Sequence, residues 1–241
     1  MRVTAGMRDL RNLYVRANSC VACHQNVDAD LLAAGHPELR FELDGQSVAE
    51  PRHWQDPAGT GAKTWLVGQA VALREMSWAL SRTDDATDSA FPKWNALVWI
   101  LSQVTMQQTR LPVINTSSTI PAKASYVDMQ GRADALARSA SEAALGDDFA
   151  RQAFHALTTV DAEFRQSKES RDVLFCRAER LVPAVYRTAI AIGADSDSGP
   201  GAEIRSLMEV IQNRDRFDAP RFADALAAYR DVVAASSPSG Q

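Results

Sequence analysis

The fold class of this chain is set by residues 63–81, which read KTWLVGQAVALREMSWALS. Apolar and small side chains recur there every three or four positions, the spacing that places them on one face of an α-helix. This face comprises Leu66, Ala70, Leu73, Ser77 and Leu80, widened by Trp65, Ala72, Met76 and Ala79. A second helix is predicted to open at Pro92, because proline is well tolerated in the first turn.

The C-terminal half of the chain repeats the same helical pattern. Apolar stripes over residues 126–140, 149–164 and 174–190 predict three longer helices, the last kinked at Pro183 and ended by Gly193. Shorter helices are expected at 202–213 and 220–235, with Asp218 as an N-cap. No alternating apolar run is long enough for a sheet, so we predict a mainly α fold.

The composition of the two halves differs. Residues 1–62 are irregular and rich in Gly, Pro, Asp and His, with helical turns expected around 7–17 and just after residue 24. Residues 110–123 contain two prolines and a polar run, as expected for a loop or linker. We therefore predict an N-terminal region at 1–110, whose irregular part packs on helices, and a helical domain at 122–241.

Composition also narrows the possible functions. The 241 residues are 46% apolar, enough for a real core, and the net charge of −4 argues against a nucleic-acid-binding protein. No stretch of eighteen apolar residues occurs, so no membrane span is predicted. We also find no phosphate-binding loop, nucleophile elbow or catalytic carboxylate pair, and Asp147 and Asp148 are interpreted as charges at a helix start.

The most informative chemical motif is Cys20-Val21-Ala22-Cys23-His24. The pattern C-x-x-C-H is the attachment site of haem c, in which two cysteines form thioethers to the vinyl groups and the histidine binds the iron. Two intervening residues let both sulfurs reach one porphyrin edge. We predict one covalent haem c held by Cys20 and Cys23, with His24 as an axial ligand.

Other interpretations of this cysteine pair stay open at this stage. Cys20 and Cys23 have the spacing of zinc ligands, and His36 or His53 could complete such a site. A second tight ligand pair, usual in structural zinc sites, is missing. A thioredoxin-like redox motif is disfavoured, because it requires a βαβ setting and the flanking residues show no strand pattern.

A second histidine lies twelve residues after His24, in Ala33-Ala34-Gly35-His36-Pro37-Glu38-Leu39-Arg40-Phe41-Glu42. Gly35 permits close backbone approach and Pro37 stops a helix, so the imidazole of His36 can project from a turn. The haem motif followed by this segment resembles multihaem c-type cytochromes. The resemblance to this family extends through residues 51–54, 65–69 and 90–92, and is weaker at residues 216–222. It implies that His36 is the second axial ligand.

The chain also departs from that family. Relatives place another C-x-x-C-H shortly after the segment Ala90-Phe91-Pro92, whereas residues 93–101 here contain no cysteine. We therefore expect one haem. His53 is then a weaker candidate ligand. Met76 and Met106 could replace His36, but both lie in apolar helical repeats that favour core packing. His155 lies in a helical pattern, and Cys176 is expected to be a buried, inert thiol.

These observations together predict a c-type cytochrome that transfers electrons and is not an enzyme, with one bis-histidine haem c. Its partners would be redox proteins and other cytochrome subunits. Alternatives are a haem protein with an open sixth site, acting as a small-ligand enzyme or sensor, and a structural subunit of a larger cytochrome complex. Haem c is attached outside the bacterial cytoplasm, so we expect a periplasmic location. The first nineteen residues lack the apolar run of an export signal, which suggests a mature form or a fragment.

Overall fold

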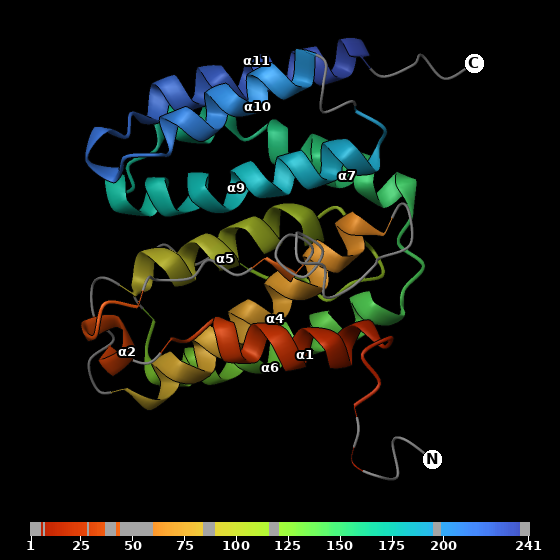
Figure 1. Cartoon of the computed structure of the whole chain (residues 1–241), viewed down its shortest axis with the longest axis vertical. Helices are drawn as coiled ribbons and strands as arrows, with labels where there is room; N and C mark the ends of the chain where they lie inside the picture. The colour runs from red at the N-terminus through yellow and green to blue at the C-terminus, as the bar shows by residue number, and fades with distance from the viewer. Residues whose placement is uncertain are drawn as a thin grey trace.

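The computed structural model describes residues 6, 8–27, 29–36, 42–43, 60–83, 90–115, 121–194 and 199–236. All regular secondary structure in these residues is helical, which confirms the predicted mainly α fold. The helices stack in layers along the longest axis of the molecule (Figure 1).

The first layer contains the longest helix, α4 (Gly61–Arg82), which packs most extensively on α6 (Lys123–Glu142). Helix α1 (Leu13–His24) lies against both, and the short helix α2 (Ala29–Ala33) lies beyond the C-terminal end of α1 (Figure 1). Most of the predicted face of α4 is buried: Leu66, Ala70, Leu73, Met76, Ser77 and Leu80 are all at most 8% exposed, whereas Ala79 at its edge is half-buried.

The next layers pair α5 (Phe91–Thr105) with α9 (Arg171–Ala191), and α9 with α7 (Asp147–Thr158). Above them, α10 (Gly199–Val210) packs on α11 (Ala219–Ser236), which also covers the short α8 (Asp161–Gln166). A 3₁₀ turn, η2 (Arg214–Arg216), connects α10 to α11. The N-terminal helices and the C-terminal pair therefore lie at opposite ends of the stack (Figure 1).

One cluster of buried apolar side chains extends from α1 to α11. The described part of the predicted linker contributes to it, because Ile114 is fully buried and its N–H donates to Thr105 Oγ1 at 3.1 Å. The predicted regions 1–110 and 122–241 share this core, and the division of the chain between them stays a prediction.

The ends of several helices follow their sequence signals. Pro92 lies in the first turn of α5, and Asp218 Oδ1 accepts a hydrogen bond from Arg221 N at 2.8 Å at the start of α11. Helix α9 continues through Pro183, and Gly193 follows its end with a φ of +87°, a value that glycine adopts without strain. These boundaries confirm the predicted caps.

The first helix differs from the prediction. Helical turns were expected around 7–17, whereas α1 begins at Leu13 and includes the whole C-x-x-C-H motif. The reason lies at Asn12, whose side chain accepts a hydrogen bond from Val15 N at 3.1 Å and so fixes the start of the helix. The turn expected after the motif is α2.

Candidate functional site: the C-terminal end of α1

The last turn of α1 places the three residues of the motif on one side of the helix. Cys20, Cys23 and His24 occupy positions i, i+3 and i+4, which are neighbours on a helical surface. Cys20 is half-buried against the core, while Cys23 and His24 are exposed. None of the three cysteines of the chain forms a disulfide. Two thiols and one imidazole are therefore presented together at the end of one helix.

The two thiols differ in environment. Partial burial raises the pKa of Cys20, an effect that the nearby Arg16 guanidinium opposes. Cys23 lies in the open, one turn further along the helix. Cys20 is therefore a protonated thiol at neutral pH, seated against the apolar core. Such a thiol can add to a carbon–carbon double bond that is brought to it.

Helix α1 is fixed to the first layer by a polar cluster near its start. Asp134 of α6 accepts hydrogen bonds from Tyr14 Oη at 2.6 Å, from Arg74 Nη1 at 2.8 Å and from Arg138 Nε at 2.8 Å. Arg138 also lies over the Tyr14 ring, 4.4 Å from its centroid. Partial burial opposes ionisation of Asp134, but these hydrogen bonds outweigh it and lower its pKa to about 2.

The other end of α1 has its own attachment. Just beyond the motif, Asn26 Nδ2 donates to the backbone carbonyl of Glu75 in α4 at 3.0 Å. Together with the Tyr14 cluster, this contact holds α1 to α4 at both ends. The direction in which Cys20, Cys23 and His24 project is thereby set by α4.

His36 lies at the end of α2, the helix that follows the motif. Gly35 adopts a φ of +92°, and His36 N donates to Leu31 O at 2.9 Å, so the chain turns sharply after α2. The imidazole of His36 is exposed. The predicted turn before His36 is confirmed at Gly35, whereas the close backbone approach predicted for Gly35 stays a prediction and Pro37 lies outside the described residues.

The segment that carries His36 is fastened to the helical body at its far end. Gln69 Nε2 of α4 donates to Glu42 Oε2 at 2.6 Å, and Arg180 Nη1 of α9 lies 3.4 Å from both Glu42 Oε1 and Gln69 Oε1. Next to this pair, a Cβ atom on Gly68 would come within 3.0 Å of Leu43 Cβ. Glu42 and Leu43 therefore meet residues 68–69 of α4 in space.

Sequence analysis did not identify Arg180 or Asp134. Arg180 is only 7% exposed and lies 138 positions from its partner Glu42, and Tyr14 and Asp134 are 120 positions apart. The one available signal was an arginine inside the apolar stripe of residues 174–190, since a buried arginine requires a partner.

The other candidate residues are placed as follows. His53 lies outside the described residues. Met76 is buried, as predicted, but the expectation that Met106 packs in the core is wrong: it is 69% exposed, because α5 ends at Thr105 and Met106 follows on the surface. His155 is exposed on α7. Cys176 is buried, and burial raises its pKa to about 11, as expected for an inert thiol.

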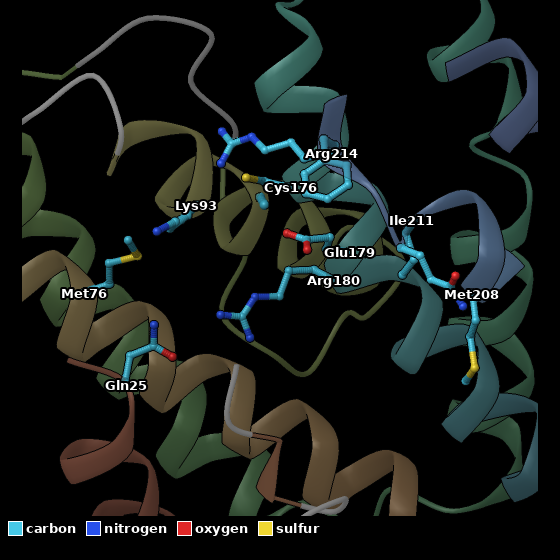
Figure 2. Close-up of a pocket in the computed structure, with 12 residues that line it drawn as sticks. Gln25, Met76, Lys93, Cys176, Glu179, Arg180, Met208, Ile211 and Arg214 are labelled. Atoms are coloured by element: carbon cyan, nitrogen blue, oxygen red, sulfur yellow. The ribbon is translucent and has the colours of Figure 1, made fainter. Parts of the chain in front are cut away.

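A cavity of about 600 Å³ adjoins the end of α1. Its wall includes Gln25, the residue directly after His24, and side chains from α4, α5, α9 and α10 (Figure 2). Figure 2 shows Gln25 and Met76 on one side, Arg180 reaching in from α9, and Lys93 from α5 between them. The volume lies in the usual range for small-molecule sites.

Scans against protein-family models, curated proteins and solved structures found no match to this chain. The resemblance to multihaem cytochromes therefore stays a prediction. Within the described ranges, no group of three or more His, Cys, Asp or Glu side chains could hold a metal ion. None of the described helices is long and apolar enough to span a membrane.

Proposed function

We propose that this protein is a monohaem c-type cytochrome that transfers electrons through a haem bound covalently to Cys20 and Cys23. The observation that carries the proposal is the presentation of both thiols and the His24 imidazole on the last turn of α1. The helical spacing suits attachment, because Cys23 and His24 lie three and four positions after Cys20 and are both its neighbours on one face of the helix.

The residues at the site fit this cofactor. Attachment consists of the addition of each S–H across one vinyl group, with the sulfur bonding to the carbon next to the ring and the hydrogen to the outer carbon. No atom is lost and no disulfide has to be broken, since Cys20 and Cys23 are both free. When bound, the haem supplies reversible one-electron exchange at its iron.

His36 is the proposed second axial ligand. Its imidazole is exposed, and its backbone leaves α2 in a sharp turn at Gly35. Glu42, the next described residue after His36, is held by Gln69 and Arg180. Two imidazole ligands would fill both axial positions of the iron, which favours electron transfer over substrate binding. Haem c attachment implies a periplasmic location, and a protein of this kind would exchange electrons with redox partner proteins and other cytochrome subunits.

The test is expression in a periplasm with haem c maturation machinery, followed by a pyridine haemochrome assay and redox absorption spectra. We expect one haem per chain and a low-spin spectrum. Changing both Cys20 and Cys23 to Ser should abolish covalent haem, whereas Cys176→Ser should retain it. Absence of haem in the unaltered protein would overturn the proposal, and zinc analysis would then test the tetrahedral-site alternative.

The axial ligand is tested separately with His36→Ala and the matched control His155→Ala, which removes an exposed histidine on α7. A high-spin spectrum in the first variant and an unchanged spectrum in the second would support bis-histidine ligation. If both variants stay low-spin, the sixth ligand is His53 or a methionine. If the unaltered protein is high-spin and binds carbon monoxide, the sixth site is open and a sensor or small-ligand enzyme becomes the better interpretation.

A further inference from the structure

We propose that the cavity between α4, α5, α9 and α10 receives the edge of the tetrapyrrole that carries its two propionate carboxylates, with Lys93 and Glu179 setting the charge around that edge. This inference rests on the proposed function. It concerns residues far from the motif in the sequence, since the α9 side of the cavity is about 150 positions beyond Cys23.

The position of the cavity is the first support. Gln25 belongs to its wall and follows His24 directly, so the backbone at the C-terminal end of α1 joins the motif to the cavity. Met76 contributes from α4, the helix to which Asn26 is hydrogen-bonded. Helix α4 therefore contacts both the cavity and the end of α1, and it fixes the position of one relative to the other.

The chemistry of the wall is the second support. Met76, Ala96 and Phe175 supply apolar contact for a ring, while Lys93, Arg180 and Arg214 supply positive charge against Glu179, the one carboxylate among the described residues of the wall. A flat apolar ring with two carboxylates at one edge matches this combination. All three cations have partners of their own: Arg180 lies 3.4 Å from Glu42, Arg214 lies 3.1 Å from Asp172, and Lys93 also interacts with another group.

A buried polar atom is the third support. Gln25 Oε1 is buried, and no described residue hydrogen-bonds to it. A buried acceptor without a partner is unfavourable, because it has lost its hydrogen bonds to water. Rotation of the same amide by half a turn presents its NH₂ group instead, which is a donor for a carboxylate. A carboxylate-bearing ligand beside Gln25 would therefore satisfy this side chain.

The test uses opposite charge changes on one wall. Lys93→Gln removes a cation and Glu179→Gln removes an anion from half-buried positions lining the cavity. A nearby positive charge favours the ferrous over the ferric state, because ferrous haem carries one positive charge fewer. We expect the midpoint potential to fall in Lys93→Gln and to rise in Glu179→Gln.

Matched controls are available on distant surfaces. Arg151→Gln on α7 and Glu142→Gln at the end of α6 remove the same charges from exposed positions that do not line this cavity. Their potentials should stay within the error of the unaltered protein. Equal shifts in the cavity and control variants, or no shift in either, would overturn the inference.

Haem content separates this inference from the proposed function. If the haemochrome assay finds no haem, the proposed function fails and takes the inference with it. If all variants carry one covalent haem but the cavity variants behave like the controls, only the inference fails. A second readout is Gln25→Leu, which should retain covalent haem and shift the haem absorption band, whereas Gln130→Leu on α6 should leave it unchanged.

Discussion

Helices α1 and α4 lie side by side but are held in place by different forces. Only Arg16, Ala17 and Val21 are buried in α1, whereas most of the 22 residues of α4 are buried, including Trp65 and Leu66. Helix α1 depends instead on hydrogen bonds made by side chains at its two ends, through Tyr14 and Asn26. The helix that carries the chemistry is attached to the body by a few polar contacts, and the body is stabilised by apolar packing.

This difference has a physical reason. In the proposed function, α1 presents two thiols and an imidazole to a large cofactor, and that face then cannot be buried in the protein core. Helix α1 therefore gains little stabilisation from apolar burial, which contributes roughly 25 cal/mol per Å² of buried surface. Hydrogen bonds to an ionised carboxylate, each worth about 1.5–3 kcal/mol, are a compact substitute.

The largest effect is expected in the body. Leu97 of α5 is fully buried in the apolar cluster, so Leu97→Ala should lower the free energy of unfolding by about 3 kcal/mol through lost burial and a residual cavity. Chemical denaturation followed by circular dichroism measures this change. Met106→Ala, at the exposed end of the same helix, is the control and should change it by less than about 0.5 kcal/mol. Similar losses in both variants would contradict the packing described here.

The next effect concerns the attachment of α1. Asp134→Asn removes the charge that Tyr14, Arg74 and Arg138 share, and should lower the free energy of unfolding by about 2 kcal/mol at neutral pH. In this variant, the rate of hydrogen exchange should rise more in α1 than in α4, relative to the unaltered protein. Asp128→Asn is the matched control, because its pair with Arg132 is exposed at 62% and 46%. Unchanged protection of α1 would mean that apolar packing alone holds it.

Acid should weaken the same attachment. The pKa of Asp134 is lowered in the folded protein from 3.8 to about 2, so its ionised form stabilises the fold above about pH 4. That contribution, about 2 kcal/mol, is lost as the pH falls from about 4 to about 2. Comparison of the unaltered protein with Asp134→Asn isolates it, since other carboxylates titrate alike in both. A constant difference between the two proteins over this interval would refute the assigned cause.

The smallest expected effect is the difference in stability between alanine substitutions at two glycines of the first layer. Gly131 in α6 has open space around its missing Cβ, so Gly131→Ala should raise the free energy of unfolding by about 0.5–1 kcal/mol. Gly68→Ala brings the new Cβ within 3.0 Å of Leu43 Cβ, and should gain none of this while loosening residues 42–43. Thermal unfolding and hydrogen exchange at Leu43 measure both. An equal gain at the two positions would show that Leu43 moves aside freely.

Much of the architecture could be predicted from the sequence, because helix formation is local. The apolar period of residues 63–81, Pro92 in a first turn, the cap at Asp218 and the stop at Gly193 all depend on neighbours within a few residues, and the structure confirms them. The motif at Cys20–His24 is local in the same sense. The prediction that Met106 packs in the core was wrong, because the apolar repeat in the sequence continues one residue past the end of α5.

The sequence by itself determined a helical protein with a C-x-x-C-H motif and with His36 in a turn. Only the tertiary structure decided what surrounds them: the cluster at Asp134, the junction of Glu42 with Gln69 and Arg180, and the cavity that begins at Gln25. The physical reason is sequence separation. Local patterns specify a helix through contacts three and four residues apart, whereas a buried arginine or aspartate finds its partner only after distant helices have packed together.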